Sequence, residues 1–211
     1  MPSDKPAISI IIPAYNVEAW VASSLDSLMK QSFKDFEVLI ADDGSTDRQQ
    51  QIWDEYQDKY EQVQVFHIEN SGAASARNFL IDKARGKYLY FMDADDWAEE
   101  TMLEDMFDFA EANKLELVIC GYYIDTYYAE DKYYRELRTA PDAVFESQQE
   151  FRNYAYKLFD AQLLYAPWNK LYLASYIKEN KIYYPKTFWD DLPFNLEVVR
   201  NIKRVGCMNK R

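Results

Sequence analysis

The chain has 211 residues, of which 48% are hydrophobic and 17% aromatic, so its composition excludes a disordered protein and its length suits one compact domain. The 24 basic and 36 acidic residues leave a net charge of −12, which excludes non-specific binding to nucleic acid through clustered lysine and arginine. One histidine and two cysteines exclude both a zinc site built from these residues and a disulfide framework.

The chain shows no membrane-spanning or secretory pattern. No apolar run approaches the roughly 20 residues that a spanning helix needs, and residues 1–6 lack the apolar region of a secretory signal. These absences predict a cytoplasmic protein. The sequence stops at Arg211 without a tapering tail, so a piece of a longer protein is also compatible with it.

The first part of the chain alternates between strand-like and helix-like patterns. Apolar runs predict strands at residues 7–13, 36–41, 63–68, 87–92 and 115–120. Helical spacing predicts helices that follow Asn16, Asp47, Gly72 and Asp96. We expect Asn16 to cap the first of these helices. The alternation predicts an α/β fold with a mostly parallel sheet and helices on both faces.

After Gly121 the alternation is lost. Tyrosine-rich runs predict an antiparallel hairpin over residues 122–128 and 132–135, with the tyrosines packed as in amphipathic strands. Further helices are expected at residues 147–159, after Tyr172 and from Asp190 or Asp191.

Polar residues follow three of the predicted strands, at residues 13–16, 42–44 and 93–96. Ligands of parallel α/β sheets bind beyond the carboxyl ends of the strands, so we expect these residues to converge. The five glycines contain no Gly-x-Gly, which excludes a dinucleotide-binding loop.

Asp93 and Asp95 form the most distinctive of these motifs. Carboxylates at i and i+2 can jointly face a ligand where a strand ends, and Mg²⁺ or Mn²⁺ is often held by one or two carboxylates plus substrate phosphates. The alternative is helix capping, because Asp93, Asp95 and Asp96 all precede a predicted helix. Three acids in four residues exceed what one cap requires.

The other motifs each have two interpretations. Asp42 and Asp43 suit an ordinary turn, or one of them accepts a hydrogen bond from a nucleotide base. Tyr15 belongs to a strand exit or stacks on that base. Arg77 lies two turns into a helix that opens with small residues, where it meets a phosphate or pairs with the acidic cluster.

Asp190 and Asp191 are cap candidates by default. Trp189 beside them supplies an apolar wall, and a shielded carboxylate with a raised pKa is the usual form of a general base. His67 is expected in the core of its apolar strand rather than in catalysis.

Taken together and in order, these motifs resemble family 2 glycosyltransferases with the GT-A fold. The matching segments are residues 8–16, 36–47, 70–78, 86–96 and 168–172, and the acidic pair that precedes residues 192–194. The resemblance implies a Rossmann-like, mostly parallel central sheet flanked by helices, with a smaller C-terminal antiparallel and helical part. It also implies one domain over residues 1–211, in which about 7–120 bind the nucleotide-sugar and about 121–211 form the acceptor side.

The resemblance further implies an inverting, metal-dependent enzyme with an Asp general base. It would transfer a hexosyl or N-acetylhexosaminyl group from a nucleoside-diphosphate sugar, most often a UDP-sugar, to a glycan or lipid-linked acceptor. The expected cofactor is Mn²⁺ or Mg²⁺, and the expected process is surface polysaccharide biosynthesis. Such enzymes are cytoplasmic, and contact with the inner face of the membrane is compatible with this role.

The family's functional residues map onto positions of this chain. Those implied to bind the nucleotide-sugar are Pro13, Ala14, Tyr15, Asp42, Asp43, Gly72, Arg77 and Asp93. Asp95 would ligate the metal. Asp191 would be the general base, with Asp190 as the alternative because it stands where the family has Glu. Trp168 and Lys170 would lie on the acceptor side, without an assigned role.

Two other functions stay open at this point. One is a non-catalytic module of the same fold that binds sugar-nucleotides or glycans. The other is a phosphatase with an aspartate nucleophile, which also uses Asp-x-Asp after a strand. That class usually places the motif on its first strand with Thr or Val following, whereas here Asp96 and Trp97 follow on the fourth.

Overall fold

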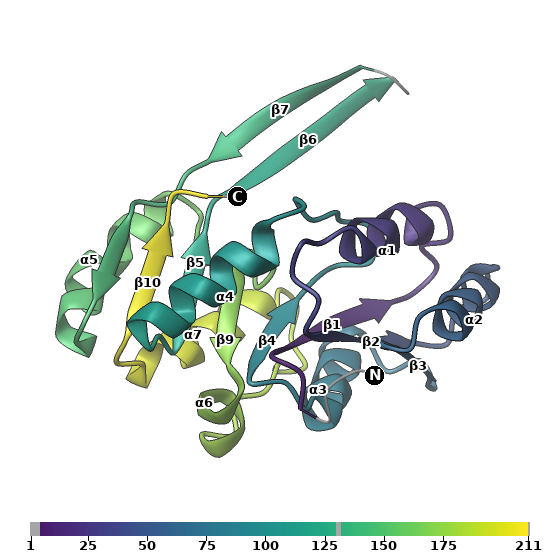
Figure 1. Cartoon of the computed structure of the whole chain (residues 1–211), viewed down its shortest axis with the longest axis horizontal. Coiled ribbons are helices and arrows are strands. Elements are labelled where there is room, and N and C mark those ends of the chain that lie inside the picture. The colour runs from purple at the N-terminus through teal and green to yellow at the C-terminus, as the bar shows by residue number, and fades with distance from the viewer. Residues whose placement is uncertain (1–4, 130–131, 211) are drawn as a thin grey trace.

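A sheet of eight strands in the order β3-β2-β1-β4-β9-β5-β10-β8 forms the centre of the protein, and a two-stranded ribbon, β6-β7, projects from it (Figure 1). The computed structural model describes residues 5–129 and 132–210. The strands are β1 (Ile8–Ala14), β2 (Phe36–Asp42), β3 (Val63–His67), β4 (Tyr88–Phe91), β5 (Leu117–Cys120), β6 (Tyr122–Ala129), β7 (Lys132–Arg138), β8 (Ala143–Phe145), β9 (Lys170–Leu173) and β10 (Val205–Met208). The helices are α1 (Val21–Met29), α2 (Gln49–Lys59), α3 (Ala73–Lys83), α4 (Met102–Asn113), α5 (Gln148–Asp160), α6 (Ala174–Glu179) and α7 (Asp191–Asn201).

The sheet is mostly parallel, as predicted. Strands β3, β2, β1 and β4 are joined by parallel pairings, and β10 lies parallel to β5. Strand β9 runs antiparallel to both of its neighbours, β4 and β5, and β8 is antiparallel to β10. Because β9 joins the two parallel groups, strands from both halves of the chain form one continuous sheet.

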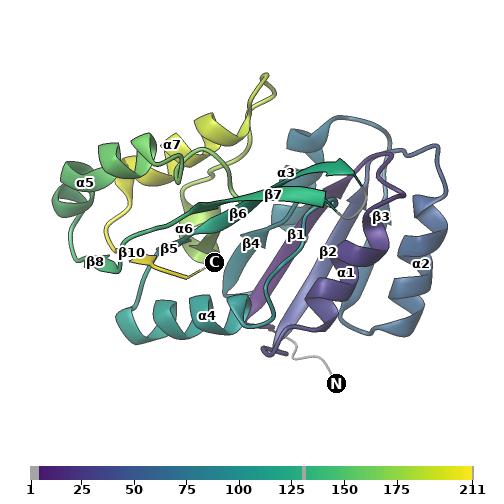
Figure 2. The same cartoon turned by 90° about the horizontal axis from the view of Figure 1, so that it is seen from above.

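Helices cover both faces of the sheet (Figure 2). Alternate residues of β1 point to opposite faces: Ile10 and Ile12 pack in the core cluster with α1, α2 and α4, whereas Ile11 packs in the cluster with α3, α5, α6 and α7. All three side chains are fully buried. Each contributes about 1.5–3 kcal/mol relative to an exposed side chain, which explains why this strand is an uninterrupted apolar run.

The start of α1 differs from the prediction. The helix begins at Val21, and Asn16 is not its cap. Asn16 instead has a φ of 51° and accepts a hydrogen bond from the Thr46 backbone N–H at 2.8 Å. An asparagine side chain satisfies a turn as readily as a helix end, and here it joins the loops that follow β1 and β2.

The start of α4 also differs, with a consequence for the acidic motif. The helix begins at Met102 after Thr101, so residues 93–101 form a loop. The capping interpretation of Asp93, Asp95 and Asp96 is therefore wrong. The prediction for His67 is also wrong, because this residue is exposed at the end of β3 rather than buried. Strands β8, β9 and β10 were not predicted from the sequence. None of the helices in the described residues is long and apolar enough to cross a membrane.

Candidate functional site

The carboxyl ends of β1, β2 and β4 open onto one cavity of about 170 Å³. Its lining consists of Pro13, Ala14, Tyr15, Val17, Asp43, Ala73, Arg77, Asp93, Ala94 and Asp95. The three polar motifs that follow these strands thus converge, as their position in a parallel sheet predicts. A larger, open hollow beside β8 and α5 is lined by the acids Glu146 and Glu150 and does not include any of the three polar motifs.

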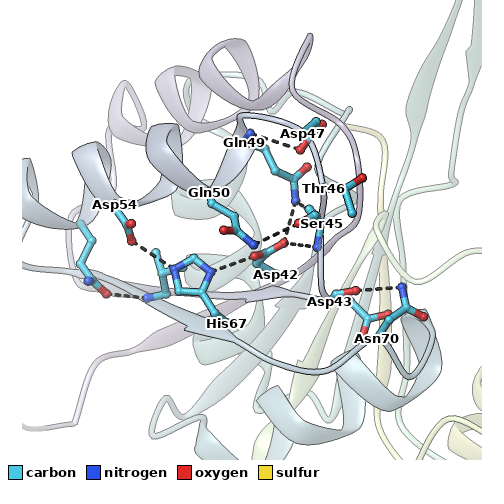
Figure 3. A network of polar contacts seen from close by, with 12 residues as sticks. Asp42, Asp43, Ser45, Thr46, Asp47, Gln49, Gln50, Asp54, His67 and Asn70 are labelled. Carbon is cyan, nitrogen blue, oxygen red and sulfur yellow. Dashed lines mark hydrogen bonds and ion pairs between the residues drawn. The ribbon is translucent and has the colours of Figure 1, made fainter.

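Asp43 connects the end of β2 to the start of α3. Its carboxylate accepts hydrogen bonds from the backbone N–H groups of Ser71 and Gly72, both at 2.8 Å. The Asn70 side-chain amide donates to the Asp43 carbonyl at 2.8 Å (Figure 3). Gly44 permits this approach, because its φ is 74° and a Cβ there would lie 3.0 Å from the Asn70 nitrogen. Gly72 is not part of the cavity lining, but its N–H binds Asp43, which is.

Asp42 lies apart from the cavity. Its side chain is fully buried and accepts hydrogen bonds from the Ser45 backbone, the Gln49 side chain and His67 Nδ1, the last at 2.8 Å (Figure 3). Burial alone would raise the pKa of Asp42, but the hydrogen bonds from Ser45, His67 and Gln49 outweigh it and lower the pKa. The hydrogen bond to Asp42 in turn raises the pKa of His67. This network holds the turn after β2, and Asp43 alone of the pair faces the cavity.

Arg77 joins α3 to the start of α7. Its guanidinium lies 2.7 Å from Asp93 and 3.4 Å from both Asp190 and Asp191, while its own side chain is 7% exposed. The guanidinium also lies over the Tyr184 ring, 5.1 Å from its centroid. Of the two predicted roles of Arg77, pairing with the acidic residues is therefore observed: Arg77 pairs with Asp93 in the loop after β4 and with the two acids at the start of α7. Residues more than 90 positions apart in the sequence meet at this side chain.

Asp191 is the first residue of α7 and is partly buried. Burial raises the pKa of Asp191 to about 6; the Arg77 charge opposes this shift, and the nearby Asp93 and Asp190 add to it. Its Oδ1 atom is buried without a hydrogen-bond partner among the described residues. A carboxylate with these properties suits a general base near neutral pH.

The sequence suggested that Trp189 shields Asp191, and this prediction is wrong. Trp189 is 75% exposed and has a φ of 60°. Tyr172 and Tyr184, both fully buried, lie close enough to Asp191 for its charge to raise their pKa values in addition to the effect of burial. These tyrosines come from β9 and the segment before α7, so the apolar surroundings are supplied by the core.

Asp95 differs from the other acids of the site. It is exposed and has no hydrogen bond or ion pair with any other described residue, whereas Asp93 is paired with Arg77. The described residues contain no ready-made group of three or more acidic, histidine or cysteine ligands. One free carboxylate at the cavity rim fits a Mg²⁺ or Mn²⁺ ion that takes its other ligands from substrate phosphates and water.

A buried polar network behind Asp191 was not predicted. The Tyr172 hydroxyl donates to Asn195 Oδ1 at 2.7 Å, and Asn195 Nδ2 donates to the backbone carbonyls of Asp191 and Tyr165, both at 3.0 Å. These hydrogen bonds fix the start of α7. An asparagine four residues after Asp191, within a helix, was the available sequence signal.

The burial of Lys170 was also not predicted. Its side chain is fully buried and donates to the Ala166 carbonyl at 2.5 Å and to Asn169 Oδ1 at 2.7 Å. Burial lowers the pKa of Lys170 to about 7. These contacts tie the loop before β9 to the sheet. Trp168 is partly buried and packs edge-on against Tyr122 of the ribbon.

Comparison with known proteins gives a consistent result. Residues 9–180 match the model of the family described as Glycosyl transferase family 2. The uncharacterized glycosyltransferase EpsJ of Bacillus subtilis is 30% identical over 207 residues, which cover 97% of this chain and 59% of that protein. The putative teichuronic acid biosynthesis glycosyltransferase TuaG of the same organism is 35% identical over 119 residues, covering 56% of this chain and 47% of that protein.

Among solved structures, S. aureus TarS in complex with UDP matches with a TM-score of 0.75 and 26% identity, over 97% of this chain and 58% of that chain. TarS in complex with UDP-GlcNAc matches with a TM-score of 0.74. The chain therefore spans about three fifths of the length of EpsJ and of the TarS chain in its UDP complex.

Proposed function

The chain belongs to glycosyl transferase family 2, and we propose that it transfers a hexosyl or N-acetylhexosaminyl group from a UDP-sugar to a glycan or lipid-linked acceptor, with inversion. One observation carries this proposal. Arg77 lines the same cavity as Asp43, Asp93 and Asp95, and it pairs both with Asp93 and with Asp190 and Asp191 at the start of α7. Because the chain spans about three fifths of the relatives' length, the activity of the whole protein is part of the proposal.

The donor would occupy the cavity at the ends of β1, β2 and β4. Pro13, Ala14 and Tyr15 provide an apolar and aromatic wall for the base, and Tyr15 is 50% exposed. Asp43 has both oxygens positioned by backbone N–H groups, and the remaining lone pairs are available to the base or ribose. The UDP and UDP-GlcNAc complexes of TarS support a uridine nucleotide.

The diphosphate requires charge compensation. The cavity and its margin contain five aspartates, Asp43, Asp93, Asp95, Asp190 and Asp191, but one arginine, in a chain of net charge −12. Asp95 would hold Mn²⁺ or Mg²⁺, since it is exposed and pairs with no other residue in the described part of the chain. When bound, the ion supplies Lewis-acid stabilisation of the leaving diphosphate. Arg77 would remain with the carboxylates, which it keeps close together.

Asp191 would act as the general base. Its carboxylate takes the proton of the acceptor hydroxyl as that oxygen attacks the anomeric carbon, and the bonding electrons leave with the diphosphate on the opposite face. Such a base contributes typically 10²–10⁴-fold to the rate. Asp190 is the weaker candidate, because its Oδ2 accepts a hydrogen bond from Arg77, whereas Asp191 Oδ1 accepts none from residues 5–129 and 132–210.

We further propose that the reaction belongs to surface polysaccharide biosynthesis and takes place in the cytoplasm, at or near the inner face of the membrane. The similarity to TuaG, named for teichuronic acid biosynthesis, supports the first part. Residues 1–211 would form one domain, with about 7–120 on the donor side and about 121–211 on the acceptor side.

Hydrolysis of UDP-sugars tests the proposal without knowledge of the acceptor. We expect slow hydrolysis of at least one UDP-sugar that requires Mn²⁺ or Mg²⁺ and is lost in Asp95→Ala, because that variant removes the free carboxylate. Turnover without a divalent ion, or unchanged turnover in the variant, would contradict the proposal. Tight UDP binding with neither hydrolysis nor transfer would instead indicate a non-catalytic binding module.

A further inference from the structure

The ribbon formed by β6 and β7 projects away from the body of the protein (Figure 1) and, seen from above, runs across the strands β1 and β4 (Figure 2). Side chains alternate between its two faces. Tyr127 pairs with Tyr133, and Asp125 pairs with Arg135, so these four side chains share one face. The neighbouring Tyr134 is on the opposite face.

This face carries a continuous stack of side chains. The Arg135 guanidinium lies over the rings of Tyr123 at 4.4 Å, Tyr133 at 5.3 Å and Trp97 at 5.5 Å. Trp97 is stacked on Tyr123 with an interplanar angle of 12°, and Tyr127 contacts Tyr133 with ring centroids 5.3 Å apart. We name this set the aromatic ladder: Trp97, Tyr123, Arg135, Tyr133 and Tyr127.

The ladder is ordered but open to solvent. Arg135 donates two hydrogen bonds of 2.7 Å, from Nε and Nη2, to the Asp125 carboxylate, which fixes the guanidinium against the rings. Tyr127, Tyr133 and Trp97 nevertheless remain 56%, 47% and 44% exposed. Side chains already held in place lose little conformational entropy when a ligand binds, so the ladder is a preorganised surface.

The chemistry of the ladder favours an uncharged ligand. The chain has a net charge of −12, yet on this face the Asp125 and Arg135 charges neutralise each other. An exposed and electrically neutral row of aromatic side chains suits the apolar C–H groups of a sugar ring. An anionic polymer would meet the repulsion of the remaining protein instead.

The position of the ladder connects it to the proposed reaction. Trp97 lies two residues after Asp95, in the loop that contributes Asp93 and Asp95 to the cavity. We propose that the aromatic ladder binds neutral sugar rings of the acceptor and leads them toward the donor cavity. The assignment of these sugars as acceptor rests on the proposed function.

Two adjacent tyrosines of β7 provide a matched test. Tyr133 belongs to the ladder and is 47% exposed, whereas Tyr134 points to the other face and is 55% exposed. Wild type, Tyr133→Ala and Tyr134→Ala are applied to an array of neutral glucose, galactose and N-acetylglucosamine oligosaccharides, with heparin and polyphosphate as anionic probes. The affinity for the oligosaccharide retained best is then measured by calorimetry.

We expect wild type to bind at least one neutral oligosaccharide, with about tenfold weaker binding in Tyr133→Ala and a change below about twofold in Tyr134→Ala. Absence of neutral oligosaccharide binding, equal losses in both variants, or binding of the anionic probes alone would overturn the inference. Self-association of wild type that Tyr133→Ala abolishes would also overturn it, because a second copy would then occupy the face.

A parallel measurement separates this inference from the proposed function. The thermal shift with UDP and Mn²⁺ is recorded for the same three proteins, and we expect it to be equal in all of them because the ladder does not line the cavity. If UDP and Mn²⁺ shift the melting temperature of none of the three proteins, the proposed function is contradicted, but the oligosaccharide binding can still be interpreted. A UDP response lost in Tyr133→Ala would contradict a role confined to the acceptor.

Discussion

At the scale of single residues, Arg77 holds the acids of the site together. Its side chain is 7% exposed, and it is the basic partner that Asp93, Asp190 and Asp191 share. Its own Nε atom is buried without a hydrogen-bond partner among the described residues. The residue thus serves to hold carboxylates from α7 and from the loop after β4 at one place, at some cost in unsatisfied polarity.

Replacement of this arginine tests that role. We expect Arg77→Leu to lower the free energy of unfolding by about 2 to 4 kcal/mol, because the carboxylates lose their shared partner. The value lies below that of a fully buried pair since Asp93 and Asp191 are 33% and 32% exposed. Urea denaturation measures the change. A loss below about 0.5 kcal/mol would show that the carboxylates do not depend on Arg77.

The pH dependence of UDP-sugar hydrolysis tests Asp191. Its pKa is raised from 3.8 to about 6, so the carboxylate is protonated below that pH and cannot accept a proton. We therefore expect the rate to rise with pH through about 6 and then level off. Asp191→Asn should lower the rate about 10²–10⁴-fold, whereas Asp190→Asn should keep the rise near pH 6. A flat profile between pH 5 and 7, or the reverse behaviour of the two variants, would contradict the assignment.

At the scale of secondary-structure elements, the hydrogen bond between β9 and α7 supports the site. The Tyr172 hydroxyl bonds to Asn195, which in turn binds the Asp191 carbonyl at the start of the helix. A second tyrosine, Tyr176 of α6, donates to the Val198 carbonyl further along the same helix at 2.7 Å. The two hydroxyls thus bind different residues of α7, and only the Tyr172 hydroxyl is linked to Asp191.

This difference gives a paired prediction. Tyr172→Phe and Tyr176→Phe should each lower the free energy of unfolding by about 1 to 2 kcal/mol, because a buried acceptor loses its donor. Only Tyr172→Phe should also lower kcat for UDP-sugar hydrolysis, since it loosens the turn that carries Asp191. Equal kcat values in the two variants would show that the network stabilises the helix without positioning the carboxylate.

The elements of the first 120 residues were predictable because each apolar run pairs with a neighbour in a regular alternation of strand and helix. Strand β9 was not, because its four residues include the buried Lys170 and its partners β4 and β5 lie far away in the sequence. The sequence also could not predict that Asp43 faces the cavity while Asp42 is enclosed. Adjacent side chains point in opposite directions, and only the packing of Gln49 and His67 decides which one is enclosed.

At the scale of the whole molecule, the charge and the topology point to the same requirement. The ends of β2 and β4 and the start of α7 bring carboxylates together in a chain of net charge −12. Such a site repels a diphosphate unless a cation accompanies it. The convergence followed from the sequence because strand order in parallel sheets constrains where the ends lie. The link to α7 did not, since Arg77 and Asp191 meet only through tertiary packing.

The most direct test of the central claim is the thermal shift produced by UDP with and without Mn²⁺. At UDP concentrations 100 times Kd, binding adds about 2.7 kcal/mol, which corresponds to a rise in Tm of about 5 to 10 °C for a chain of this size. We expect this rise with Mn²⁺ in wild type and in Asp96→Asn, and its loss without the ion or in Asp95→Asn. An equal rise without the ion, or one that Asp95→Asn retains, would contradict a donor site completed by a metal at Asp95.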